Sequence, residues 1–190
     1  MEPLTPDQAY EQLRQGHQRF LNDEGGGDGR SGARRVELAD GQAPFVAILC
    51  CADSRMSPEI VFDTGLGDVF VVRVAGNVAN PCSIASIEYA VAHLGTKLVA
   101  VVGHQSCGAV AAAVEGGDAG KNLNHLIGHI NPALAKSGST DVDTVARCNA
   151  QLNAERLVQD SEIIRQAVED GTARIVSGFY HLKSGEVDIL

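Results

Sequence analysis

The chain is short of several residue classes, and each shortage narrows what the protein can be. It has no tryptophan, only 4% aromatic residues, and 15 lysines and arginines against 24 aspartates and glutamates, a formal net charge of −9. The excess of negative charge repels phosphate backbones and anionic lipid, so we expect no nucleic-acid and no membrane partner. No apolar run approaches the roughly 18 residues of a membrane span, and residues 1–7 lack the features of a secretory signal. We therefore expect a cytoplasmic protein.

The rest of the composition is that of an ordinary globular protein. The 190 residues are 44% hydrophobic and 21% charged, which argues against disorder and against a coiled coil. Five cysteines are present, and in a chain large enough to fold without disulfides they favour metal binding or redox chemistry. We expect a single domain overall, with an arm over residues 1–43 and an α/β unit over 44–190.

The arm is predicted to contain a helix and a glycine-rich linker. Thr5 and Gln8 have the spacing of a capping box, and apolar residues at helical spacing follow as far as Asn22. Residues 23–32 offer few side chains for packing, so we expect a mobile linker there, followed by a short helix over 34–39. A helix tethered in this way is expected to dock on a neighbouring subunit instead of its own core.

Short apolar runs rich in valine and isoleucine dominate the α/β unit, and they are typical of strands buried on both faces. The runs lie at 45–49, 69–72, 98–102 and 175–179. Helices are predicted between them, over 83–94 before Gly95 and over 140–170 before Gly171. Residues 181–190 have the pattern of a turn and a final strand. The sequence predicts an α/β fold with helices on a mostly parallel central sheet and an antiparallel C-terminal edge strand.

The first unusual cluster of polar residues directly follows the strand predicted at 45–49. Cys51, Asp53 and Arg55 alternate along the chain, so in an extended segment they project to the same side. Cys50 competes with Cys51 as a metal ligand, but alternation directs it to the opposite side, so we favour Cys51. A thiolate, a carboxylate and a guanidinium are thus expected on one face.

The second cluster directly follows the strand predicted at 98–102. His104 and Cys107 lie three residues apart on a tight turn that leads into a helix. Ligands of open α/β sheets gather at the carboxyl ends of strands. Cys51, His104 and Cys107 together form a three-ligand zinc set that leaves one coordination position open, which indicates a catalytic zinc rather than a structural one.

Other candidate ligands receive no role. Cys50, Cys82 and Cys148 are interpreted as core or surface thiols. His125 and His129 are four residues apart on a predicted helix, the spacing of a metal-binding pair, but no glutamate follows His125 as a metalloprotease would require. Capping or surface roles are the better interpretation for both histidines.

Three blocks of the sequence resemble the signature blocks of β-class carbonic anhydrases. They are residues 51–55, 67–77 and 103–109, and the resemblance extends over nearly the full chain. It implies a Zn²⁺ held by Cys51, His104 and Cys107, with Asp53 either taking the fourth position or pairing with Arg55 to admit water.

The resemblance also implies a function and an assembly. A carbonic anhydrase hydrates CO₂ reversibly to bicarbonate and a proton by means of zinc-bound hydroxide. Gln42 matches a family position whose amide can hydrogen-bond the substrate or bicarbonate across a subunit boundary. Members of the family are dimers or multiples of dimers, so a homodimer or a dimer of dimers is expected.

Two other functions stay open at the level of the sequence. The same scaffold and the same hydroxide could attack carbonyl sulfide or carbon disulfide. Alternatively, the protein is a non-enzymatic regulatory module in which the zinc is structural and the adjacent Cys50 and Cys51 sense oxidation. The identity of the fourth zinc ligand would distinguish this regulatory module from an enzyme.

Overall fold

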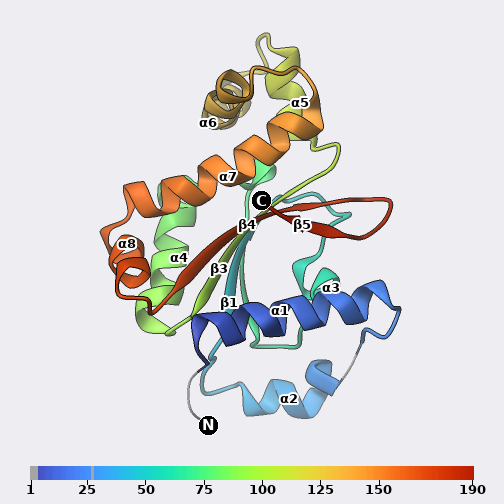
Figure 1. Cartoon of the computed structure of the whole chain (residues 1–190), viewed down its shortest axis with the longest axis vertical. Helices are drawn as coiled ribbons and strands as arrows, with labels where there is room; N and C mark the ends of the chain where they lie inside the picture. Colours follow the sequence, from blue (N-terminus) through green and yellow to red (C-terminus); the bar gives the residue numbers. More distant parts are fainter. Residues whose placement is uncertain (1–3, 27) are drawn as a thin grey trace.

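The computed structural model describes residues 4–26 and 28–190. Residues 1–3, which belong to the stretch predicted to lack a secretory signal, and Gly27 of the expected linker lie outside the described residues. None of the described helices combines the length and apolar character needed to cross a bilayer. The elements, drawn in Figure 1, are α1 (Pro6–Leu21), η1 (Asp28–Arg30), α2 (Gly32–Glu37), β1 (Val46–Cys50), α3 (Pro58–Val61), β2 (Val69–Arg73), η2 (Ala75–Asn77), α4 (Pro81–His93), β3 (Leu98–His104), α5 (Gly108–Glu115), α6 (Lys121–Ser137), α7 (Val142–Asp160), α8 (Glu162–Glu169), β4 (Arg174–Tyr180) and β5 (Val187–Ile189).

One five-stranded sheet organises the chain, in the order β2-β1-β3-β4-β5. The first four strands of that order are parallel, and β5 is antiparallel to β4. Every residue of β1 and β3 is buried, as continuous apolar runs require of the central strands of a parallel sheet. The α/β class and its antiparallel C-terminal edge strand, predicted from the sequence, are confirmed.

Helices cover both faces of this sheet (Figure 1). Alternation along β1 sends Val46, Ile48 and Cys50 to a core cluster shared with α1 and α3. Ala47 and Leu49 point the other way, into a cluster shared with α4, α7 and α8. The burial of the five β1 side chains therefore fixes the direction in which the next residue, Cys51, points.

The strand order reverses between β1 and β3. The chain passes from β1 to β2 on one side and then crosses back to place β3 on the other side of β1. The carboxyl ends of β1 and β3 consequently have connections that diverge, which is the position where open α/β sheets bind ligands. Both polar clusters of the sequence lie at these two strand ends.

Helix α1 packs on its own chain, so the expectation that it docks on a neighbouring subunit instead is wrong. The predicted capping box of Thr5 and Gln8 is present. Ala9 and Leu13 are buried in the core cluster on one face of the sheet. Because the apolar stripe of α1 packs on the face of its own sheet that it shares with α3, burial there needs no partner.

The expected mobile linker is also wrong for the part that the structure describes. The amide of Gly26 donates to Asp63 Oδ1 at 2.8 Å, and the amide of Leu66 donates to the Gly29 carbonyl at 2.8 Å. A Cβ on Gly29 would lie 2.8 Å from Gly65 Cα. Two glycines allow the backbones to approach closely, and backbone hydrogen bonds then hold the segment without side-chain packing.

The predicted helix over 140–170 is two helices, α7 and α8, separated by Ser161. This residue is extended and caps α8 by accepting the Ile164 amide, while its hydroxyl donates to Glu88 Oε1 at 2.6 Å. The break turns α8 onto α4 and lets Ile164 become fully buried. A serine that caps a helix is a weak breaker by itself, and the contact with Glu88 on α4 supplies the tertiary reason.

Candidate metal centre

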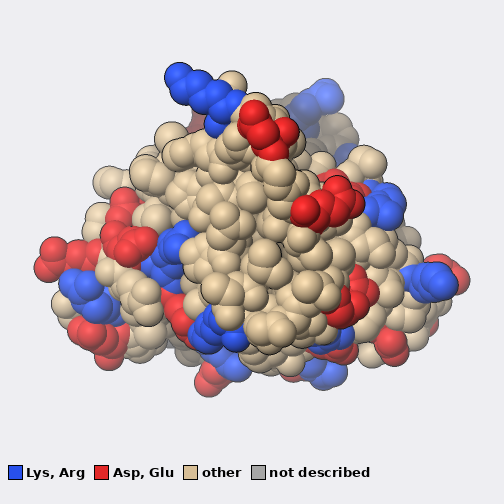
Figure 2. All heavy atoms as spheres, turned by 90° about the horizontal axis from the view of Figure 1, so that it is seen from above, with Lys and Arg blue, Asp and Glu red and all other residues tan. Residues whose placement is uncertain are grey.

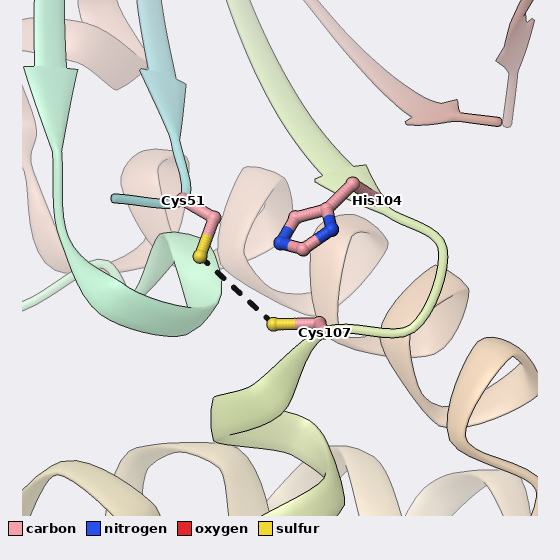
Figure 3. Close-up of side chains that lie close together, drawn as sticks. All are labelled: Cys51, His104 and Cys107. Atoms are coloured by element: carbon pink, nitrogen blue, oxygen red, sulfur yellow. Dashed lines mark hydrogen bonds between the residues drawn. The ribbon is translucent and has the colours of Figure 1, made fainter. Parts of the chain in front are cut away.

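Three side chains from the two strand ends meet at one point (Figure 3). Cys51 follows β1, His104 ends β3, and Cys107 precedes α5. Their potential ligand atoms all lie within 4.8 Å of one another. All three residues are buried, with exposed fractions of 5%, 0% and 1% in that order. The structure therefore brings together the three residues that the sequence singled out.

The spacing of the two sulfur atoms suits a shared metal ion. Cys51 Sγ lies 3.9 Å from Cys107 Sγ, almost twice the length of about 2.05 Å for a disulfide bond. Two thiolates bound to one tetrahedral zinc at about 2.3 Å each would lie roughly 3.8 Å apart. The pair has the separation of two ligands on one ion rather than that of a disulfide.

The imidazole of His104 also has the arrangement of a metal ligand. Its Nδ1 lies 2.9 Å from the Gln105 carbonyl, and because a carbonyl only accepts, Nδ1 carries the proton. Nε2 is then an acceptor, and it is buried without a hydrogen-bond partner among the described residues. An unpaired buried nitrogen is costly, whereas a metal-binding histidine commonly donates its other ring N–H to a carbonyl.

Without a cation beside them, the two cysteines do not both ionise. Hydrogen bonding with the neighbouring Cys107 thiol lowers the pKa of Cys51 to about 4, although burial opposes this shift. His104 and the Gly76 amide lower the pKa further. The Cys51 thiolate and burial in turn raise the pKa of Cys107. Burial alone would lower the pKa of His104, but Cys51, the Gln105 carbonyl and Asp53 together raise it. A divalent cation would allow both sulfurs to ionise.

Asp53 and Arg55 form a forked ion pair beside the three ligands. Arg55 Nε lies 2.9 Å from Asp53 Oδ1, and Arg55 Nη2 lies 2.7 Å from Oδ2. Asp53 Oδ2 is 3.9 Å from His104 Nε2. The guanidinium holds the pKa of Asp53 well below its usual range. Of the two arrangements that the sequence left open, this structure has the carboxylate paired with Arg55.

Arg73 holds the loop that carries Cys51 and Asp53, and sequence reasoning missed it. Its guanidinium donates to three backbone carbonyls, those of Cys51 at 3.0 Å, Asp53 at 2.6 Å and Met56 at 3.0 Å. The available signal was a charged residue at the end of an apolar strand, since β2 pairs Arg73 with Cys50 of β1.

A second support, also missed, reaches Cys51 from α7. The Gly76 amide donates to Cys51 Sγ at 3.3 Å, and Gly76 has a positive φ of 70°, which glycine adopts without strain. Asn149 Nδ2 donates to the Gly76 carbonyl at 2.7 Å, and Asn153 Nδ2 donates to Asn149 Oδ1 at 3.0 Å. Two asparagines spaced by four on the buried face of a helix were the available signal.

The remaining candidates lie away from this centre. Gln42 precedes the amino end of β1, whereas Cys51 follows its carboxyl end, and it lines a cavity of about 560 Å³ with Leu38 and Leu66. Cys50 is fully buried in the cluster on the opposite face. Cys82 is exposed and Cys148 is half-buried. His125 and His129 have ring centroids 5.1 Å apart, and no third ligand joins them among the described residues.

The sequence is similar to curated bacterial enzymes over almost its whole length. The family model described as "Carbonic anhydrase" matches residues 46–187. A carbonic anhydrase of Mycolicibacterium smegmatis is 35% identical over 192 residues, with 97% of this chain and 93% of the relative covered. Carbonic anhydrase 2 of Mycobacterium tuberculosis has the same identity and coverage.

Solved structures have the same fold. A tetrameric β-carbonic anhydrase of Sordaria macrospora superposes with a TM-score of 0.77 at 26% identity, covering 96% of this chain and 93% of that one. The Coccomyxa β-carbonic anhydrase in complex with acetazolamide gives 0.72 at 27% identity, covering 82% and 75%. The fold of this chain thus has counterparts among solved β-carbonic anhydrases.

Proposed function

This chain belongs to the β-carbonic anhydrase family, and from that premise we propose that it hydrates CO₂ reversibly with one Zn²⁺ held by Cys51, His104 and Cys107. The observation that carries the proposal is the convergence of two sulfurs 3.9 Å apart with a buried, unpartnered imidazole nitrogen. Asp53 and Arg55 lie beside these atoms. Carbonate dehydratases are lyases, and the reaction is CO₂ plus water giving bicarbonate and a proton.

The donor set defines what the metal would contribute. Zinc held by three protein ligands would supply a Lewis acid that lowers the pKa of a water molecule toward neutrality. Two thiolates cancel the formal charge of the ion, so this Lewis acid is weaker than one held by three neutral histidines. The protein must therefore help the attacking water through its own groups.

Asp53 and Arg55 are proposed to give that help. The pKa of Asp53 is held low by Arg55, so its carboxylate is ionised and can only accept hydrogen bonds. By accepting a hydrogen bond from the attacking oxygen, the carboxylate orients that oxygen so that a lone pair is directed toward CO₂. Arg55 grips both carboxylate oxygens, which fixes the direction of acceptance and keeps Asp53 from taking a ligand position.

The substrate is tested by assaying two reactions on one purified sample. We expect CO₂ hydration, followed by stopped-flow pH change, to exceed release of sulfide from carbonyl sulfide under matched conditions. Dominant sulfide release would move the assignment to the carbonyl sulfide or carbon disulfide hydrolase that the sequence left open. Protein that holds zinc but catalyses neither reaction would contradict the proposed enzyme.

We also propose a homodimer, or a dimer of dimers, in which the partner's Gln42 hydrogen-bonds substrate or bicarbonate. Within one chain Gln42 is separated from its own metal centre by the five residues of β1, roughly 16 Å of strand. A copy carrying a net charge of −9 associates with another most easily through uncharged surface. Figure 2 shows such a face at the end of the molecule that carries α5 and α6, but Gln42 lies at the opposite end, between α2 and β1, so this face is not the surface that would deliver the partner's Gln42.

Mixed dimers provide the test of Gln42. Gln42→Ala homodimers should lose about tenfold in kcat/KM, and Cys107→Ala homodimers should be inactive for lack of zinc. In a mixed dimer of the two variants, the metal centre of the Gln42→Ala chain would receive an intact Gln42 from its partner. We expect such dimers, purified by two different tags, to regain about half of the wild-type activity, one of two sites being complete.

The same mixed dimer separates the two placements of Gln42. If Gln42 served the centre of its own chain, neither site in the mixed dimer would be complete. Activity would then stay at or below that of the Gln42→Ala homodimer, which would contradict the proposal.

A further inference from the structure

The turn that joins two of the metal-ligating residues is held by contacts from outside it. This turn is residues 104–107, between the end of β3 and the start of α5. The amide of Gln105 donates to the Tyr180 carbonyl at 2.9 Å. The amide of Ser106 donates to Asp143 Oδ1 at 2.7 Å, and the Ser106 carbonyl accepts from Arg55 Nη2 at 3.3 Å.

Ser106 has a backbone conformation that requires such support. Its φ is 53°, in the left-handed region, which side chains other than glycine rarely adopt without tertiary contacts. The hydrogen bond from its amide to a carboxylate is charge-assisted and short, so it is among the stronger contacts available to a backbone group. Asp143 thus stabilises the strained residue directly.

The position of Arg55 also depends on Ser106. Its side chain is 51% exposed and would be free to move without anchors. Its side-chain partners among the described residues are the carboxylate of Asp53 and the carbonyl of Ser106. A rotation of the Ser106 backbone would remove the second anchor and loosen the fork on Asp53.

Asp143 lies in the first turn of α7, but it is not the residue that supplies the N-cap. Asp141 is the N-cap of α7, and its carboxylate accepts the Thr144 amide at 2.8 Å and the Thr144 hydroxyl at 2.6 Å. Two aspartates two residues apart therefore have separate tasks. One closes the helix end, and the other reaches across to the turn of residues 104–107.

We propose that Asp143 is a positioning residue for CO₂ hydration. By holding the Ser106 amide, it fixes the Ser106 carbonyl that anchors Arg55, and through Arg55 it orients the Asp53 carboxylate. This inference rests on the proposed function, because it assigns Asp143 a part in the reaction proposed for this centre.

The test compares Asp143→Ala with Asp141→Ala as a matched control from the same helix end. Both variants, the double variant Asp143→Ala/Ser106→Gly and the wild type are assayed for zinc content, thermal unfolding midpoint and the kinetics of CO₂ hydration. We expect Asp143→Ala to keep its zinc and lose about tenfold in kcat/KM. Asp141→Ala should lower the unfolding midpoint by at least as much and leave kcat/KM unchanged.

The double variant separates positioning from a general loss of structure. Glycine adopts a φ of 53° without penalty, so Ser106→Gly should restore kcat/KM of the Asp143→Ala protein to within about threefold of wild type. Equal kcat/KM values for Asp143→Ala and Asp141→Ala would overturn the inference, as would a double variant that recovers nothing. A wild type without hydration activity would instead overturn the proposed function, and the inference with it.

Discussion

Cys107→Ala should yield a folded protein with less than about 0.1 zinc per chain and at least about 1000-fold slower CO₂ hydration. Cys107 supplies one of three ligand atoms that lie within 4.8 Å of one another, and its loss leaves a thiolate and an imidazole that are too few to hold the ion tightly. Cys51→Ala and His104→Ala should behave in the same way. Metal analysis and stopped-flow hydration on the same samples measure both effects.

The control for this experiment is the neighbouring cysteine. Cys50 is also fully buried, but it faces the core cluster under α1 and not the metal centre. Cys50→Ala should therefore keep about one zinc per chain and wild-type hydration, while losing about 1 kcal/mol of stability from the smaller side chain. Loss of zinc in Cys50→Ala with retention in Cys51→Ala would reverse our assignment of the ligand.

Asp53→Ala should separate metal binding from catalysis. The carboxylate is paired with Arg55 and is not one of the three convergent ligands, so most of the zinc should remain. Hydration should fall at least about 100-fold in kcat/KM, the size of effect expected when a preorganised polar group is removed from a reacting centre. Metal content and kcat/KM are measured together.

Two further variants test the fork itself. Arg55→Lys keeps the positive charge but cannot grip both carboxylate oxygens, so it should also lose activity while keeping zinc. Glu155→Ala removes an exposed carboxylate whose ion-pair partner in the described part of the chain is Lys136, and it should change neither quantity. An Asp53→Ala protein with wild-type hydration would contradict the role assigned to the pair.

The pH dependence of hydration follows from the same pair. Arg55 keeps the pKa of Asp53 well below its usual range, so the carboxylate stays ionised above about pH 5. Changes of rate above that pH consequently arise from other groups, the attacking water first among them.

Much of the fold and of the centre was predictable because local signals determine it. The valine- and isoleucine-rich runs gave all four parallel strands within two residues of their observed ends, since a buried strand needs an unbroken apolar run. Alternation along β1 separated Cys51 from Cys50 correctly. The carboxyl ends of β1 and β3 meet at the reversal of strand order, which explains why residues 53 apart in the chain converge.

The features that could not be predicted depend on tertiary contacts. Ser161 breaks a helix because Glu88 of another helix accepts its hydroxyl, and the glycine segment is ordered because Gly29 lies against Gly65. Arg73 and Asp143 support the ligand loops through backbone groups distant in sequence. Such contacts leave no periodic pattern in the chain. The cytoplasmic location and the lack of a nucleic-acid partner stay predictions from charge and hydropathy.

Zinc K-edge X-ray absorption of the purified protein tests the central claim most directly, because it counts the atoms bound to the metal. We predict two sulfurs at about 2.3 Å and two nitrogen or oxygen atoms at about 2.0 Å, one from His104 and one from an exchangeable water. A shell of four sulfurs, or protein isolated without chelators that contains no zinc, would contradict it.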